Sequence, residues 1–411
     1  MSSKKIGLAI IGTGMAAKPH ALALNELKDD INVVGVFSRN KEKRENFSKN
    51  YNFNSFQEID SIYDNPEVDM VDIITPPNQR LELVEQFSKY GKHILMEKPI
   101  ERTLENAKSI VSICENNKVK LGIVFQHRFR KSSIKLKSLI NENKFGQIFS
   151  AQINIPWWRE QSYYDEPGRG TYKRDGGGVL ISQAIHTLDL AISLLGDVKD
   201  VMVMAETTKF HKMESENFVT GGIKFKNSVI ASLFASTSVF PGSSESIVLH
   251  CENATVKLES GTLIINWRNG KKEEFGEESG TGGSADPMAF PFDWHKDLIL
   301  NFAKSINTNE KFNFLCNDIM RHFDLFRKTL NQQEIQKDLK RFSNLSSLEM
   351  KYYFIWGYPY LFEFSNHHIS VSVITKEIIF DNSIKSLNYS NISLMRQDSL
   401  NSKFISICKS D

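Results

Sequence analysis

Short apolar runs rich in β-branched residues alternate with amphipathic stretches over the first 125 residues, and the apolar positions of those stretches recur at the helical period. This alternation predicts a parallel sheet with connecting helices on both of its faces. The predicted strands are 5–11, 32–37, 70–74, 93–96 and 121–125, and the predicted helices are about 17–27, 41–50, 79–89 and 104–116. We therefore expect an α/β domain over residues 1–125.

The pattern changes after residue 146, where a long predicted helix is followed by alternating strands without helices between them. The helix is predicted at 177–195 and the strands at about 200–207, 217–225, 228–238, 246–250, 254–258 and 263–266. Consecutive strands of this kind favour a large, mostly antiparallel sheet. Two further helices, at 294–306 and 316–330, are predicted to close this second domain, which we place at 126–340.

The C-terminal tail, 341–411, is rich in Ser, Asn and aromatic residues and contains an alternating run at 368–380. We assign it no role from the sequence. It is expected to form a small hairpin or to be poorly ordered, as chain ends often are.

Composition excludes several classes of protein. The chain has 411 residues, which favours two domains, and its 40% hydrophobic and 24% charged content with a net charge of +2 gives no reason to expect nucleic acid or a membrane as partner. Its four cysteines form no C-x-x-C pair, so we expect neither a metal site nor a disulfide framework. Without a signal-like N-terminus or an apolar run of about 18 residues, a cytoplasmic location is expected.

A glycine-rich turn joins the first predicted strand to the first predicted helix. Its residues are Gly12, Thr13, Gly14, Met15, Ala16 and Ala17, in the order G-x-G-x-x-A. Gly12 permits the tight turn, Gly14 permits close approach of a pyrophosphate, and the helix that follows offers its N-terminal N–H groups to phosphate. Taken alone the motif also fits an ordinary strand-to-helix turn. Its context predicts NAD or NADP binding by residues 12–16.

The end of the second predicted strand bears on the choice of cofactor. Ser38 and Arg39 stand where an acidic residue would bond the adenosine ribose, and Lys43 and Arg44 follow one turn later. An acidic group would repel a 2′-phosphate, whereas Ser and Arg attract it. We therefore expect NADP to be slightly favoured over NAD, the alternative being that Arg39 is an ordinary surface residue.

Two more turns are predicted to lie beside the cofactor, because the carboxyl ends of parallel strands meet at the ligand-binding edge of an open sheet. Thr75, Pro76 and Asn78 belong to the turn that follows strand 70–74. Glu97 and Lys98, in the tripeptide Glu97-Lys98-Pro99, follow strand 93–96 and place an amine near the expected nicotinamide ring. Gln126, after the fifth strand, is the last predicted cofactor contact.

With these motifs the chain resembles the Gfo/Idh/MocA family of NAD(P)-dependent sugar oxidoreductases. The resemblance covers about residues 5–330 and rests on Gly12-Thr13-Gly14, Thr75-Pro76-Pro77-Asn78, Gly91-Lys92-His93 leading to Glu97-Lys98-Pro99, and Gly176-Gly177-Gly178 leading through His186 to Asp189. It implies an N-terminal Rossmann domain followed by a C-terminal α/β domain built on a large, mostly antiparallel open sheet, which supports the substrate and often a subunit interface.

The chemistry that the resemblance implies requires a group that takes the hydroxyl proton as hydride leaves carbon. We predict His186 as the principal acid/base and Lys98 as the partner that orients and polarises the oxygen. The family often has an aspartate four residues before the histidine, but here that position is Ser182, followed by Gln183. We expect both to face the cleft with His186 and to bond substrate hydroxyls. The alternative for His186 is a satisfied core histidine, and for Asp189 we favour a supporting role.

The predicted substrate pocket combines aromatic faces with polar donors. Its candidate residues are Arg128, Trp158, Arg159, Tyr164 and Arg169, together with Ser182, Gln183 and His186. Sugar rings stack on aromatics through their C–H faces while polar groups bond the hydroxyls, so a carbohydrate or cyclitol is favoured. Aromatic residues in such a loop also suit a dimer contact, and an interdomain hydrogen bond is an equal alternative for Arg128.

The function predicted from the sequence is hydride transfer between NAD(P) and a hydroxyl or ketone carbon of a sugar, a sugar derivative or inositol. A non-catalytic cofactor-sensing regulator or scaffold is the alternative, because fold alone does not determine function. A third possibility keeps the enzyme but gives it a dihydrodiol or a tetrapyrrole as substrate. The broad open sheet predicts a homodimer or homotetramer.

Overall fold

The computed structural model describes residues 5–277, 280, 283 and 290–308, and five strands between residues 360 and 407. The chain forms two compact units, residues 1–338 and 339–411, which are treated separately below. In these described parts, no helix is both long enough and apolar enough to cross a membrane.

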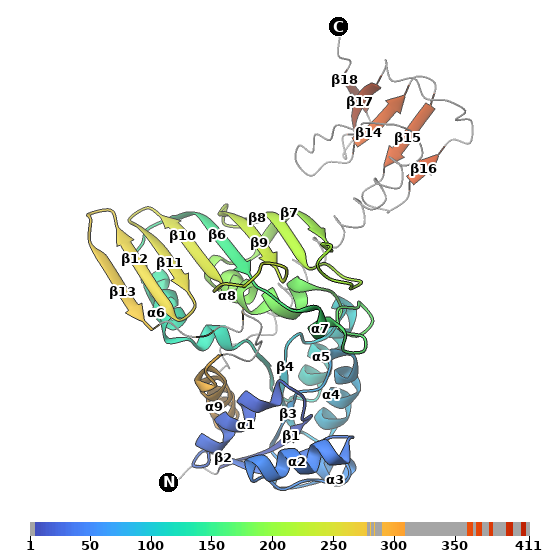
Figure 1. Cartoon of the computed structure of the whole chain (residues 1–411), viewed down its shortest axis with the longest axis vertical. Coiled ribbons are helices and arrows are strands. Elements are labelled where there is room, and N and C mark those ends of the chain that lie inside the picture. The colour runs from blue at the N-terminus through green and yellow to red at the C-terminus, as the bar shows by residue number, and fades with distance from the viewer. Residues whose placement is uncertain are drawn as a thin grey trace. The chain divides into compact units, whose positions relative to one another are not determined.

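The first sheet is parallel and has the strand order β2-β1-β3-β4-β5 (Figure 1). Its strands are β1 (Ile6–Ile11), β2 (Ile31–Phe37), β3 (Met70–Ile73), β4 (His93–Glu97) and β5 (Leu121–Val124). The helical segments between and after them are α1 (Ala17–Glu26), α2 (Lys41–Tyr51), α3 (Asp60–Tyr63), η1 (Pro77–Gln79), α4 (Arg80–Lys89), α5 (Leu104–Asn116) and η2 (Gln126–Phe129). All five predicted strands and four predicted helices are confirmed to within two residues at each end. Strands β1, β3, β4 and β5 are buried almost throughout, as expected of a sheet covered on both faces.

The second sheet has eight strands in the order β13-β12-β11-β10-β6-β9-β8-β7. They are β6 (Ile148–Pro156), β7 (Val198–Glu206), β8 (Phe218–Phe225), β9 (Ile230–Ser236), β10 (Ser246–Cys251), β11 (Ala254–Glu259), β12 (Thr262–Trp267) and β13 (Lys272–Gly276). Every pairing is antiparallel except that of β6 with β9. The predicted antiparallel sheet is confirmed, but the sequence pattern missed two of its strands, β6 between β9 and β10 and β13 at one edge. In β6, Ser150, Gln152 and Asn154 alternate with buried residues and interrupt the apolar run.

Helices α6 (Lys131–Asn141) and α8 (Ile185–Leu195) cover one face of this sheet, as Figure 1 shows. A short helix, α7 (Gln161–Tyr164), follows β6, and a π-helix at Leu180–Ala184 leads directly into α8. The helix predicted at 177–195 therefore starts later, at Leu180. Gly176 and Gly177 have φ values of +85° and +157°, which a helix does not permit, and a Cβ on Gly178 would lie 1.8 Å from the Glu216 carbonyl oxygen.

Helix α9 (Asp293–Asn307) returns from the second sheet to the first half of the molecule. It packs against α1, β4 and β5, and a Cβ on Gly122 would meet the Phe302 ring at 2.7 Å. The prediction that this helix closes the second domain is therefore wrong, because its apolar face covers the parallel sheet. The other predicted helix, 316–330, lies outside the described residues.

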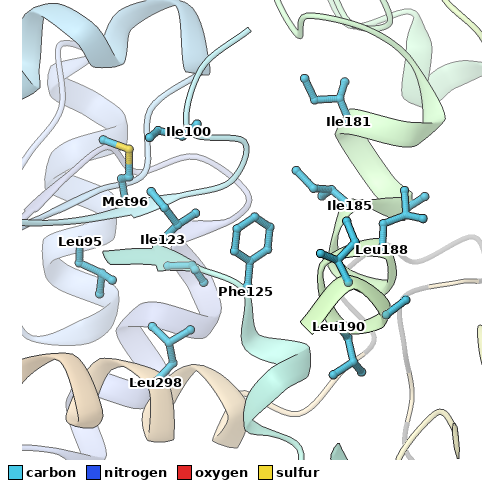
Figure 2. Packing of buried hydrophobic residues seen from close by; sticks show 14 of the residues in the cluster. Leu95, Met96, Ile100, Ile123, Phe125, Ile181, Ile185, Leu188, Leu190 and Leu298 are labelled. Atoms are coloured by element: carbon cyan, nitrogen blue, oxygen red, sulfur yellow. The ribbon is translucent and has the colours of Figure 1, made fainter. Parts of the chain in front are cut away.

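One hydrophobic core continues through both halves of this unit. In Figure 2 the Phe125 ring, which follows β5, points toward Ile185 and Leu188 of α8, while Leu298 of α9 lies below β5. Phe125 is 2% exposed and Leu188 is fully buried. The two sheets are thus joined by packed side chains, which keeps the residues between them in a fixed arrangement.

The second unit contains a five-stranded antiparallel sheet with the order β16-β15-β14-β17-β18. Its strands are β14 (Tyr360–Phe364), β15 (His367–Val371), β16 (Ile378–Phe380), β17 (Ile392–Gln397) and β18 (Phe404–Ile407). The tail is therefore more than the single hairpin that the sequence suggested.

Candidate functional site

The predicted cofactor residues follow the carboxyl ends of all five parallel strands. Gly12 follows β1, Ser38 follows β2, Thr75 lies just beyond β3, Lys98 follows β4 and Gln126 lies just beyond β5. This is the edge at which open α/β sheets bind ligands. The strand order changes direction at β1 and β3, so the crevice at this edge lies beside the glycine turn.

The glycine turn fits a dinucleotide. Gly12 has φ +112°, and a Cβ there would lie 3.0 Å from the Ile74 carbonyl group, whereas a Cβ on Gly14 would meet nothing within 4 Å. Helix α1 has no side-chain cap at its N-terminus, so its first N–H groups are available to a phosphate. The buried hydroxyls of Thr13 and Thr75 have no hydrogen-bond partner in the described part of the chain, so both are free to bond a ligand. Met15 is 54% exposed and Ala16 half-buried beside them.

The end of β2 carries basic and neutral groups. The buried Arg44 side chain donates to the Ser38 carbonyl oxygen at 2.9 Å and to Gln57 at 2.8 Å, which fixes the turn. Arg39 and Lys43 are exposed next to it. The basic residues predicted after β2 are therefore present at its carboxyl end, but Arg44 is buried and holds the turn at Ser38.

Arg80 of α4 ties the two remaining turns together. It donates to the Thr75 carbonyl oxygen at 2.9 and 2.7 Å, and also to the carbonyl oxygens of Glu97 and Pro99. Pro76 and Asn78 are held in the same turn, at the start of η1. One buried guanidinium thus fixes Lys98 relative to the rest of the carboxyl edge.

Lys98 lies between the two halves of the molecule. Its Nζ donates to the Ser182 carbonyl oxygen at 2.7 Å, within the π-helix. Burial lowers the pKa of Lys98 to about 8, the Glu97 carboxylate opposes that shift, and Arg80 and Arg159 add to it. A lysine in this state exchanges protons near neutral pH, and π-helical turns are often found at functional sites.

His186 lies deeper than the sequence suggested. It is 7% exposed, its ring lies 5.1 Å from that of His127, and its Nδ1 has no hydrogen-bond partner among the described residues. Burial, and then the charge of Lys98, hold the pKa of His186 well below its usual value. His186 is not among the described residues that line the pocket below, whereas Ser182 and Gln183 are. Ser182 lies within the π-helix and His186 in the first turn of α8, so the two do not belong to one regular α-helix.

A pocket of about 150 Å³ opens beside Lys98. Its described lining consists of Pro77, Lys98, Pro99, Tyr163, Tyr164, Arg169, Gly170, Asp175, Gly178, Ser182, Gln183 and Met213. The Arg169 guanidinium lies 4.2 Å from the centre of the Tyr163 ring and pairs with Glu166. The Tyr164 hydroxyl bonds Thr237 at 2.7 Å, and Asp175 accepts a hydrogen bond from the Gly170 N–H at 2.8 Å. Aromatic faces and charged groups therefore meet in one concave site.

Three other predicted residues, Trp158, Arg159 and Gln126, are not among the described residues that line this pocket. Trp158 donates to Glu160 at 3.0 Å and packs against Phe240, while Arg159 is buried and donates to the Trp158 carbonyl oxygen at 2.7 Å. Gln126 is buried, and its Oε1 has no hydrogen-bond partner in the described part of the chain.

Arg128 forms a bidentate pair with Asp189, with both bonds at 2.6 Å. Both residues belong to the second domain as we placed it, 126–340, so this bond lies within that domain and is not the interdomain bond considered as the alternative to substrate contact. The pair agrees with a supporting role for Asp189.

Sequence reasoning missed three residues that hold the site. His20 of α1 and Asp72 of β3 are fully buried and bonded to each other at 2.6 Å. Glu216 accepts hydrogen bonds from the N–H groups of Gly178 and Leu180 and so caps the helix that contains Ser182. A charged residue within the apolar run of β3 was the available signal for Asp72.

Comparisons with known proteins agree with this arrangement. Residues 6–125 match a family described as an oxidoreductase family with an NAD-binding Rossmann fold, and residues 133–257 match the GFO/IDH/MocA C-terminal domain. Residues 301–404 match a family of proteins of unknown function, DUF1045.

Individual relatives cover different shares of the chain. An uncharacterized Saccharomyces cerevisiae protein, YMR315W, is 26% identical over 74% of this chain and 89% of its own length. The glucose-6-phosphate 3-dehydrogenase of Bacillus subtilis is 34% identical over 37% of this chain and 42% of its own length. The structure of the WlbA dehydrogenase from Bordetella pertussis, in complex with NADH and UDP-GlcNAcA, superposes with a TM-score of 0.70 at 21% identity, over 82% of this chain and 97% of that one.

The two family matches lie in the order and at the positions that the resemblance predicted, and together they include the glycine turn, Lys98 and His186. The solved structure shares the fold. Through residues 6–257 the chain belongs to the Gfo/Idh/MocA family of oxidoreductases with an NAD-binding Rossmann fold.

Proposed function

We propose that this protein transfers a hydride between a nicotinamide cofactor and a hydroxyl or ketone carbon of a sugar, a sugar derivative or inositol. The observation that carries the proposal is the Lys98 amine, which lies at the carboxyl edge of the parallel sheet and lines the pocket, with a pKa of about 8. A non-catalytic sensor needs the glycine turn but has no use for a proton-exchanging amine in the substrate pocket.

A nicotinamide, when bound, supplies the carbon that accepts or donates the hydride. The neutral Lys98 amine accepts the hydroxyl proton as the substrate is oxidised, and the ammonium returns that proton to the carbonyl oxygen in the reverse direction. The Ser182 carbonyl oxygen holds the amine in place at 2.7 Å. His186 is uncharged near neutral pH, a weak base, and not among the described residues that line the pocket, so we assign the proton transfer to Lys98.

The pocket supports a hydroxylated, ring-shaped substrate. Tyr163 and Tyr164 offer aromatic faces, and Arg169, Asp175 and Gln183 offer donors and acceptors for hydroxyl groups. Two relatives carry names that agree with such a substrate: one is a dehydrogenase of glucose 6-phosphate, and the other has a nucleotide sugar, UDP-GlcNAcA, in its structure.

The test is to mix the purified protein with NAD⁺ or NADP⁺ and a panel of aldoses, uronic acids, amino sugars, sugar phosphates, nucleotide sugars and inositols. We expect nicotinamide absorbance to rise with at least one of them, and to stay unchanged when Lys98 is replaced with Ala. Tight cofactor binding without turnover of any of these, or of a dihydrodiol or a tetrapyrrole, would instead favour the sensor.

For the cofactor we propose that NADP is bound at least as well as NAD. Ser38 and the exposed Arg39 and Lys43 surround the position of the adenosine ribose. Replacing Arg39 with Ala is expected to raise the KM for NADP about tenfold and to leave that for NAD almost unchanged, because one contact with a phosphate is worth about 1.4 kcal/mol. Lys49→Ala, which removes an exposed charge from the far end of α2, is the control. An unchanged ratio of the two KM values in Arg39→Ala would contradict the proposal.

We propose a homodimer or homotetramer that assembles through the outer face of the second sheet. Met202 and Ile230 are 66% and 58% exposed there, and the rings of Phe218 and Phe234 lie 5.4 Å from each other on strands of the same sheet. Light scattering at micromolar concentration is expected to give at least twice the mass of one chain. Met202→Glu should shift the protein toward the monomer, whereas Tyr90→Glu, at an exposed aromatic residue of the first half, should not. A strict monomer in the wild type would exclude this assembly.

We also propose a cytoplasmic location, which the free thiols of the buried Cys114 and Cys251 support.

A further inference from the structure

A buried histidine links the glycine turn to Lys98. His20 lies on α1, and its Nδ1 is 2.6 Å from an Asp72 carboxylate oxygen of β3, while its Nε2 is 3.1 Å from a Glu97 carboxylate oxygen at the end of β4. His20 and Asp72 are fully buried and Glu97 is 7% exposed. With a carboxylate on each side, both ring nitrogens must donate, which requires the charged imidazolium.

The charges around this ring favour the same state. Burial alone lowers the pKa of His20, but Asp72 and then Glu97 overcome it and raise that pKa to about 10. The pKa of Glu97 falls to about 2: burial opposes this change, and the hydrogen bond and charge of His20 outweigh it. His295 of α9 stacks edge-on against His20 at 5.1 Å and stays neutral, because burial and the charge of His20 lower its pKa to about 3.

The Glu97 carboxylate continues the connection to the pocket. Its Oε1 is bonded to His20 and its Oε2 accepts a hydrogen bond from the Lys98 backbone N–H at 3.0 Å. His20 lies one helical turn after Ala16, in the helix whose N-terminus faces the expected cofactor phosphates. His20, which belongs to the helix expected to bind the phosphates, is therefore bonded to Glu97, the residue before Lys98.

We propose that His20 is a positioning residue: as a fixed positive charge it joins α1 to Glu97, holds the Lys98 backbone and offsets the Glu97 charge beside the Lys98 amine. The proposal concerns the charge state of the site and rests on the proposed function only where it gives Lys98 the proton transfer. The other described charged and titratable groups coupled to Lys98 are Arg80 of α4, Arg159 after β6, Asp175 of the pocket loop, His127 of η2, His186 of α8 and His295 of α9.

A consequence can be measured at Lys98 itself. His20→Gln keeps a donor at this position but removes the positive charge, so the Glu97 carboxylate then acts on Lys98 without compensation. The pKa of Lys98 is expected to rise by about one unit, which lowers the neutral fraction of the amine about tenfold below that pKa. Glu97→Gln should lower the Lys98 pKa. In the double variant His20→Gln/Glu97→Gln, the Lys98 pKa should lie between its values in the two single variants.

The experiment is competitive acetylation of the full chain with trace acetic anhydride across a pH series, with Lys98 modification quantified by mass spectrometry. It needs neither substrate nor turnover. His93→Gln, at the opposite end of β4, is the control, because it changes a histidine of the same strand without altering the charge beside Lys98. Comparable circular dichroism spectra establish that each variant is folded.

A second measurement uses only the wild type. In [¹⁵N]histidine-labelled protein at about pH 9, an imidazolium signal is expected to persist, although an ordinary histidine has lost its proton by then. An unchanged Lys98 profile in His20→Gln, or no imidazolium signal at this pH, would overturn the proposal.

Metal content gives a third outcome. Donor atoms of His20, Glu97 and His295 lie within 4.8 Å of one another, so a stoichiometric divalent metal in the purified protein would replace the proton on His20 and would also overturn the proposal. Failure of the proposed function is distinguishable from all of these results. It would appear as absent turnover with the Lys98 shift intact, whereas turnover without the shift would exclude only the role of His20.

Discussion

Replacing Lys98 with Met is expected to lower kcat by about 10²–10⁴-fold, the range typical of a lost general acid or base. The methionine side chain keeps most of the volume of the lysine but cannot accept or return a proton. The dissociation constant for the cofactor should change little, because the glycine turn and the N-terminal N–H groups of α1, which are proposed to bind the cofactor phosphates, are unchanged. Steady-state kinetics with the substrate identified by the panel, and fluorescence titration with NADPH or NADH, measure the two quantities.

The pH dependence of the wild type provides an independent check on Lys98. Its pKa of about 8 requires oxidation of the alcohol to accelerate as the pH rises through 8, where the amine becomes neutral, and to level off above it. Reduction of the ketone, which needs the ammonium, should slow over the same interval. Lys89→Met, at an exposed lysine of α4, should leave kcat and the pH profile unchanged. Wild-type activity in Lys98→Met would remove lysine from the mechanism and return the proton transfer to His186.

Replacing Arg128 with Met is expected to lower the free energy of unfolding by about 3–5 kcal/mol, the usual effect of removing one partner of a buried ion pair. Asp189 is fully buried on α8, and the change deprives its carboxylate of the bidentate guanidinium. The double variant Arg128→Met/Asp189→Asn should recover part of the loss, because it removes the buried charge as well. Urea denaturation monitored by circular dichroism measures the free energy of unfolding of the wild type, the single variant and the double variant.

The same variant distinguishes the two roles considered for Arg128. A structural role predicts that KM for the substrate stays within about threefold of the wild type at a temperature where the variant is folded, a difference below 1 kcal/mol. A small loss of stability with a KM raised tenfold or more would instead establish contact with the substrate. Lys131→Met, at an exposed residue nearby at the start of α6, controls for loss of a positive charge in this region.

The sequence by itself determined the parts of the molecule that depend on near neighbours. The apolar pattern predicted the five parallel strands and their helices, because strands buried on both faces appear as short continuous apolar runs, whereas the buried face of a helix recurs about every 3.6 residues. The glycine turn and Glu97-Lys98-Pro99 were recognisable for a similar reason: their geometry is set by residues adjacent in the chain. Since strands of one parallel sheet end at one edge, the cofactor side of the site followed from the same pattern.

The tertiary structure decided the features that join distant segments. The pairing of Arg128 with Asp189, of His20 with Asp72 and Glu97, and of Lys98 with the Ser182 carbonyl group each spans 50 residues or more of sequence. No local period encodes such contacts, because they depend on which faces pack together. The tertiary structure also places Ser182, but not His186, among the described residues that line the pocket. Burial between the two sheets then decides the chemistry: it leaves Lys98 able to exchange a proton and keeps His186 neutral.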